Sequence, residues 1–162
     1  MSAPEVTVKR GWAVRRAGFW DPAAAVDRVV LDAGDRHRRR IMLNGAQGTP
    51  FLLDLDEAVA LRDGDGIMLD DGTIVLVTGQ AEPLAEIAVR TPLGLMQMAW
   101  HLGNRHTDVQ IVGDRLRIRR DHVLEEMAVG RGAAVTVIDA PFDPEAVVPQ
   151  EYKHEHTHDH DR

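Results

Sequence analysis

Closely spaced turn signals divide the first half of the chain into short apolar runs, and this spacing constrains the fold more than any other feature. The turns combine Asn, Asp and Gly, which tight turns favour, at Asn44-Gly45, Arg62–Gly66 and Asp70–Gly72. Apolar runs with such punctuation are typical of strands. The predicted strands are Arg28–Leu31, Ile41–Leu43, Phe51–Leu55, Ile67–Leu69 and Ile74–Thr78. We therefore expect residues 1–80 to form a small antiparallel β domain, either a sandwich or a barrel.

The second half of the chain alternates strand and helix signals. After a predicted linker at Gly79–Leu84, apolar and polar residues alternate through Glu86–Arg90, which predicts a strand. Thr91 and Pro92 are an N-cap and a first helical residue, so a helix is expected through Leu93–Leu102. Gly103 is expected to end this helix by adopting the left-handed backbone conformation.

A hairpin and a second helix complete this half. The predicted strands Asp108–Val112 and Arg115–Arg119 are joined by Gly113-Asp114. In the second of these strands, Leu116 and Ile118 point one way and three arginines point the other. Asp121 caps a helix that is predicted to end at Gly130, with Val123, Leu124, Met127 and Ala128 on its buried stripe, and Ala134–Ile138 forms a last strand. The order β-α-β-β-α-β is ferredoxin-like. We therefore predict an α+β protein, with this second domain at residues 81–148 and a disordered polar tail at 149–162.

Composition excludes several classes of protein. The formal net charge of −7 argues against a nucleic-acid binder, because the phosphate backbone is bound by a basic surface. The absence of cysteine excludes disulfides, thiolate metal sites and a cysteine nucleophile. No stretch approaches the ~20 apolar residues of a membrane span, and residues 1–12 lack a signal-peptide pattern. We expect a cytoplasmic protein without a membrane partner.

The end of the chain is rich in histidine. His154, His156, His158 and His160 alternate with Glu, Thr and Asp. Such a segment cannot build a core, but a flexible chain can bring several imidazoles to one ion. An expression tag and metal binding without a role are the alternatives. Imidazole suits nickel, zinc, copper and iron, so the pattern predicts a metal without identifying it.

A second candidate ligand, His106, follows the first predicted helix. One imidazole makes a poor site, since metal sites use about four donors. In a two-fold homodimer, however, His106 near the axis would meet its own copy, and tail histidines would complete the shell. An apolar helix face of Leu93, Met96, Met98 and Trp100 would supply the interface; a fully buried core helix is the alternative.

The other features of the chain have simpler interpretations. His101 is expected to be structural, and His122 to be an exposed side chain. The basic run Arg36–Arg40 is either a solvated strand face or a surface for an acidic partner. The Asp-Gly turns lack the spacing of a calcium loop, and no hydrolase, P-loop or dinucleotide motif occurs, so no enzyme is predicted.

Several motifs together resemble the urease accessory metallochaperone family, UreE. The most specific is Ala99-Trp-His-Leu-Gly-Asn-Arg-His106, followed by Gln110-Ile111 and Asp121-His-Val-Leu124. The segment Pro141–Glu145, the arginines Arg38–Arg40 and the Leu61–Asp65 segment are also similar to the family. The resemblance covers nearly the whole chain.

This resemblance implies a function and a set of partners. It implies a β-rich peptide-binding domain, a ferredoxin-like metal-binding domain and a homodimer with Ni(II) between two copies of His106. It also implies delivery of nickel cargo to the apo-urease complex, with the urease GTPase accessory protein UreG as direct partner. Zn(II) or Cu(II) would substitute for nickel in such a site. Arg120 stands where some members have a second histidine, so a paired peripheral site is not expected. A general divalent-metal buffer without a client is the alternative function.

Overall fold

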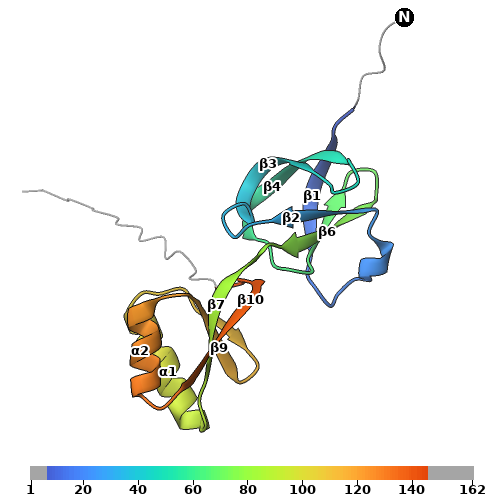
Figure 1. The fold of residues 1–162 in the computed structure, drawn as a ribbon. Coiled ribbons are helices and arrows are strands. Elements are labelled where there is room, and N and C mark those ends of the chain that lie inside the picture. The colour runs from blue at the N-terminus through green and yellow to red at the C-terminus, as the bar shows by residue number, and fades with distance from the viewer. Residues whose placement is uncertain (1–6, 146–162) are drawn as a thin grey trace, which may run out of the picture.

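The chain forms two β-sheets, each with its own buried apolar core (Figure 1). The computed structural model describes residues 7–145. Mostly strands and two α-helices make it an α+β protein, as predicted. Within the described residues, no helix is long and apolar enough to cross a membrane. The predicted tail at 149–162 lies outside the described residues.

The first sheet has six strands in the order β2-β6-β5-β1-β4-β3. They are β1 (Lys9–Arg15), β2 (Asp27–Leu31), β3 (His37–Asn44), β4 (Pro50–Ala60), β5 (Gly66–Leu69) and β6 (Ile74–Gly79). The prediction of a purely antiparallel sheet is wrong, because β1 pairs with β4, and β2 with β6, in parallel. β1 was not predicted from the sequence: only Gly11 in it is buried, so it shows no apolar run.

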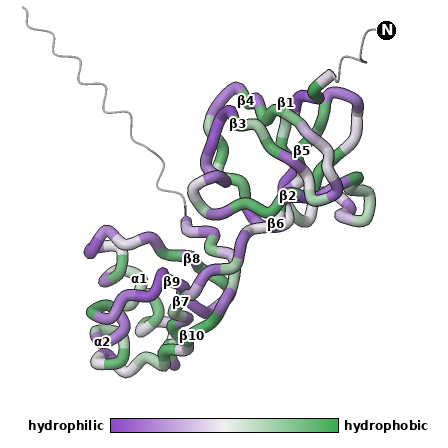
Figure 2. The backbone as a smooth tube through the Cα atoms, turned by 45° about the horizontal axis from the view of Figure 1, so that its top comes forward, coloured by the Kyte–Doolittle hydropathy of each residue, from purple (hydrophilic) through white to green (hydrophobic). Residues whose placement is uncertain are grey.

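This first sheet curls around its own core. The only helical turn beside it in the described residues is the short η1 (Pro22–Ala24). A sheet without helical cover must bury one face against itself, and the fully buried side chains come from several of its strands. They are Phe51, Leu53, Ile67, Leu69, Val75 and Val77. Along the first sheet, the tube changes repeatedly between hydrophobic and hydrophilic residues (Figure 2).

Two buried carboxylates stabilise the turns of this sheet. Asp27 accepts hydrogen bonds from the backbone N–H groups of Arg28, Gln47 and Thr49. Burial raises its pKa, but these hydrogen bonds outweigh burial and leave the pKa below its ordinary value. Asp65 accepts from the N–H groups of Arg62 and Ala17. The carboxylate of Asp65 is therefore engaged inside its turn.

The second sheet is antiparallel in the order β10-β7-β9-β8, with two helices on one face (Figure 1). Its elements are β7 (Ala81–Ala88), α1 (Pro92–Asn104), β8 (Gln110–Val112), β9 (Arg115–Arg119), α2 (His122–Gly130) and β10 (Ala134–Pro141). The predicted β-α-β-β-α-β order is confirmed. The predicted linker at Gly79–Leu84 is wrong: only Gln80 separates β6 from β7. Pro83 is tolerated in β7 because pairing with β9 begins at Leu84.

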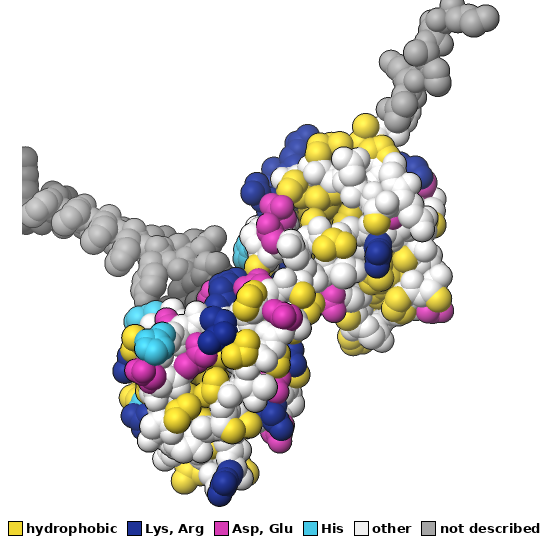
Figure 3. All heavy atoms as spheres, in the orientation of Figure 1, with side chains coloured by type: hydrophobic (Ala, Val, Ile, Leu, Met, Phe, Trp, Pro, Cys, Tyr) yellow, Lys and Arg dark blue, Asp and Glu magenta, His cyan; other side chains and the backbone are white. Residues whose placement is uncertain are grey.

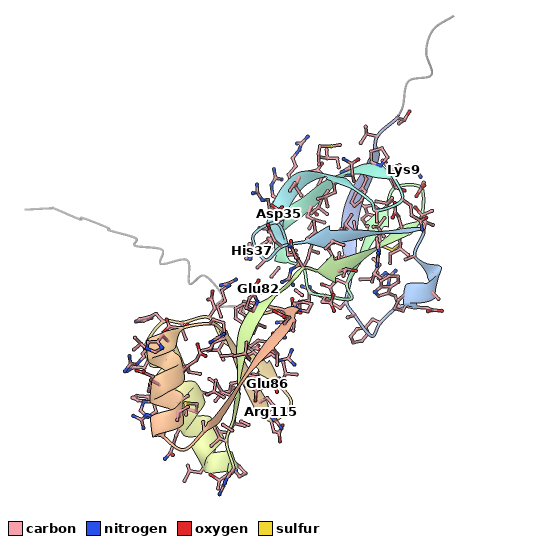
Figure 4. All side chains as sticks on the ribbon, in the orientation of Figure 1. Lys9, Asp35, His37, Glu82, Glu86 and Arg115 are labelled. Atoms are coloured by element: carbon pink, nitrogen blue, oxygen red, sulfur yellow. The ribbon has the colours of Figure 1, made fainter. Side chains whose placement is uncertain are left out.

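The open face of this sheet carries ion pairs. The arginines of β9 alternate with Leu116 and Ile118, which are buried toward the helices. Glu86 contacts Arg115 at 3.2 Å and Arg117 at 3.0 Å (Figure 4). The sequence-based division of β9 into an apolar and an arginine face is therefore correct.

Both helices begin as predicted; α2 also ends at Gly130 as predicted, whereas α1 extends to Asn104. The side chains of Thr91 and Asp121 accept from the N–H groups of Gly94 and Leu124, so both N-caps are confirmed. Gly103, however, lies within α1 and is not left-handed. The left-handed residue is His106, with φ of 56°. In α2, Gly130 is helical, and Gly132 adopts the left-handed conformation (φ 88°).

A buried arginine joins the end of β10 to the first sheet. Arg36 is only 3% exposed and donates to the Phe142 carbonyl and the Asp143 carboxylate. The Arg119 guanidinium lies 4.7 Å from the centre of the Phe142 ring. The segment that follows β10 is therefore fixed between the two sheets.

Candidate metal-binding site

His106 occupies an unusual backbone conformation at the end of α1. Its N–H donates to the Gly103 carbonyl at 3.0 Å, and its φ is 56°. Few residues other than glycine adopt this conformation, which costs about 1–3 kcal/mol. Such strain is concentrated at functional sites. His106 is also exposed, so its imidazole is accessible.

A shallow pocket surrounds this histidine at the meeting point of the two helices. It is lined by Arg105, His106, Thr107, Asp121, Val123 and Leu124. The Asp121 carboxylate is used as the cap of α2. Within residues 7–145, no group of three or more His, Asp or Glu side chains is arranged to hold a metal. A metal at His106 therefore needs donors from elsewhere.

An exposed apolar face on α1 leads to this pocket. Leu93, Met96 and Trp100 are 60%, 63% and 64% exposed, at a spacing that places them on one helix face. Val123 of α2 is 60% exposed and lines the pocket. Met98, predicted to share this face, is only 2% exposed and belongs to the core. Exposed apolar patches of this kind mark interaction surfaces.

The three other described histidines lie on three different elements, α1, α2 and β3. The ring of His101 packs edge-on against Trp100, with 5.0 Å between ring centres. His122 is exposed, as predicted, and its Nε2 lies 3.2 Å from Glu126. His37 begins β3 on the side of the first sheet nearest the second (Figure 4). His154, His156, His158 and His160 lie outside the described residues.

The sequence did not reveal two features of the site. Nothing in the order of residue types shows that His106, rather than Gly103, is left-handed. The contribution of Val123 was also missed, because the sequence placed it on the buried stripe of α2. The only available signal was the motif around His106.

Comparison with known proteins assigns both halves of the chain to one family. Residues 12–79 match the N-terminal domain, and residues 82–162 the C-terminal domain, of "UreE urease accessory protein". These two matches cover both sheets.

Individual relatives carry the same description. The urease accessory protein UreE of Rhodopseudomonas palustris (strain BisB18) is 53% identical over 150 residues, which is 91% of this chain and 71% of the relative. That of Bradyrhizobium sp. (strain ORS 278) is 54% identical over 137 residues, or 85% and 65% of the two chains. That of Chelativorans sp. (strain BNC1) is 46% identical over 143 residues, or 84% and 90%. The chain belongs to the UreE urease accessory protein family.

Proposed function

We propose that this chain is a nickel metallochaperone that delivers Ni(II) during assembly of the urease active site. The observation that carries the proposal is the exposed, left-handed His106 at the end of an apolar helix face. Relatives named as urease accessory proteins support the urease client. The protein acts as a carrier, without catalysis of its own.

The metal site in this proposal is shared by two chains. Burying Leu93, Met96 and Trp100 of both copies in a two-fold homodimer would remove their exposed apolar surface from water. The same symmetry would bring two His106 imidazoles together. Tail histidines, drawn from His154, His156, His158 and His160, would complete the shell and exchange readily, which transfer requires.

In this proposal, the ligands of the site do not determine which metal the protein carries. Imidazole ligands prefer Cu(II) to Ni(II), so Zn(II) or Cu(II) can substitute. Nickel would be selected by the supply of metal in the cytoplasm and by the protein partners. These partners are the GTPase accessory protein UreG and the apo-urease complex.

A delivery assay separates this function from that of a general metal buffer. The nickel-loaded chain is added to apo-urease with its other accessory proteins, at limiting total nickel. We expect several-fold more urease activity than with the same nickel supplied as a histidine complex, because a carrier passes its metal directly to a bound partner. A general metal buffer would instead compete with apo-urease for the limiting nickel. Equal or lower activity, together with no retention of UreG on the immobilised chain, would reject delivery in favour of buffering.

Truncation after Pro149 tests the role assigned to the tail. We expect calorimetry to show fewer nickel ions per dimer, because four imidazoles per chain are removed. Light scattering should still show a dimer, since the proposed interface lies on α1. A monomeric product would contradict this placement of the interface.

A further inference from the structure

The chain leaves the second sheet at one edge and contacts it again at the other. β10 and β8 are its two edge strands, with β7 and β9 between them. Adjacent strands lie about 4.8 Å apart, so these edges are separated by about 14 Å. β10 ends at Pro141, yet the N–H of Glu145 donates at 2.7 Å to the carbonyl of Val109, the residue before β8. We call residues 142–145 the crossing segment.

Contacts at both ends hold the crossing segment in place. Phe142 is only 1% exposed. Arg36, from the turn before β3, donates to the Phe142 carbonyl and to the Asp143 carboxylate. On the β8 side, the N–H of Asp143 donates to the side-chain oxygen of Gln110 at 3.2 Å. The position from which the chain continues beyond Glu145 is therefore fixed beside β8.

This fixed position lies close to His106. His106 is three residues before Val109 in the chain, so their Cα atoms are at most about 11 Å apart. The hydrogen-bonded peptide groups add at most about 7 Å between the Cα atoms of Val109 and Glu145. The Cα atoms of His106 and Glu145 are therefore within about 18 Å of each other. His106 is exposed, and histidine side chains show on the surface over the two helices (Figure 3).

The positions of the last histidines in the sequence suit this distance. His154 is nine residues, and His160 fifteen residues, beyond Glu145. Unrestrained chains of these lengths have r.m.s. end-to-end distances of about 15–18 Å and 19–23 Å. The effective concentration of a tethered ligand is highest when the r.m.s. length of its tether matches the span. Without the crossing segment, the same histidines would be tethered to the opposite edge of the sheet.

We propose that the crossing segment positions the tail for metal binding, because it fixes the origin of the tail where the tail histidines are concentrated at His106. This inference rests on the proposed function, in which His106 and the tail histidines share one metal. Arg36 and Gln110 then act on the metal only through the segment that they hold. Closing the gap between the two sheets would by itself require the contacts of Arg36, but not the continuation of the chain to Val109.

Two insertions of one Gly-Ser linker of about 20 residues into the full chain test this proposal. Placed after Glu145, the linker should weaken the tight nickel site at least about fourfold, because effective concentration falls as the −3/2 power of tether length. Placed between Pro141 and Phe142, it precedes the crossing segment and should change the affinity less than about twofold. The buried Phe142 and the pair of Arg36 with Asp143 should keep the segment in place, since the cost of closing a loop grows slowly with its length. Competition with a chelator of known nickel affinity measures both variants.

The same linker between His160 and Asp161 is the control for the linker itself and should leave the affinity unchanged. Equal losses from the linkers before and after the crossing segment would overturn the proposal, because the segment would then not hold the origin of the tail. Wild-type affinity with the linker after Glu145 would also overturn it. The variant His106→Asn separates these failures from that of the proposed function. Wild-type affinity in this variant would reject the shared metal site together with the positioning role. Weakened binding in this variant, with no effect of any linker, would reject the positioning role alone.

Discussion

Replacing His106 with alanine is expected to weaken the tightest nickel site by at least about 100-fold. Loss of one outer-shell partner already costs 10–100-fold in metal affinity, and in the proposed dimer this substitution would remove two direct ligands from the shared site. Isothermal calorimetry at pH 7.5 should therefore show only weak binding by the tail. Alanine is also unfavourable at the left-handed position of residue 106. An effect on the backbone must therefore be distinguished from the loss of the imidazole ligand.

Two variants make that separation. His106→Asn removes the imidazole but retains a residue type that tolerates positive φ, so it should lose nickel affinity while unfolding at the same temperature as the wild type. His122→Ala removes an exposed histidine of α2 and should leave the tight site unchanged. Wild-type affinity in His106→Asn would disprove the shared site.

Arg36→Ala is expected to destabilise the protein by about 3–5 kcal/mol, because it leaves a largely buried carboxylate without its partner. Asp143 is only 13% exposed, and Arg36 also satisfies the Phe142 carbonyl. Chemical denaturation should show the loss as a lower midpoint. Small-angle scattering should show a larger radius of gyration, because this contact fixes the end of β10 against the first sheet.

The neighbouring arginine provides the control for this prediction. Arg38→Ala removes an exposed side chain from β3, close to Arg36 in the chain, and should change stability by less than about 0.5 kcal/mol. Equal midpoints for the two variants would show that Arg36 does not hold the two sheets together.

Local patterns in the sequence were sufficient for much of the fold. Turn residues and apolar runs located five of the six strands of the first sheet, and the caps Thr91 and Asp121 located the helix starts. These signals are local, because turns and N-caps depend on residues only a few positions apart. β1 was missed because its exposed Trp12 and single buried Gly11 give no period of two. The parallel pairings were missed because they join strands that are distant in the chain.

Of the candidate site, the sequence predicted the histidine at position 106 but not its backbone conformation or the exposure of its neighbours. Gly103 is the better left-handed residue by intrinsic preference, yet the helix continues through it to Asn104. His106 adopts the strained left-handed conformation instead. The N–H groups of Arg105 and His106 donate to the carbonyls of Leu102 and Gly103 and so close the last turn of the helix. Met98 and Val123 were assigned to the wrong sides of their helices, because an apolar residue type does not specify which face packs on the sheet.

The sequence by itself determined the α+β class, the order of elements in the second half and the motif that carries the family. Tertiary structure alone decided that His106 adopts the left-handed conformation, that Leu93, Met96 and Trp100 remain exposed, and that Arg36 is buried while Arg38 and Arg40 are not. The physical reason is that exposure and backbone strain depend on which distant segments pack together. Capping and turn formation depend only on close neighbours in the chain.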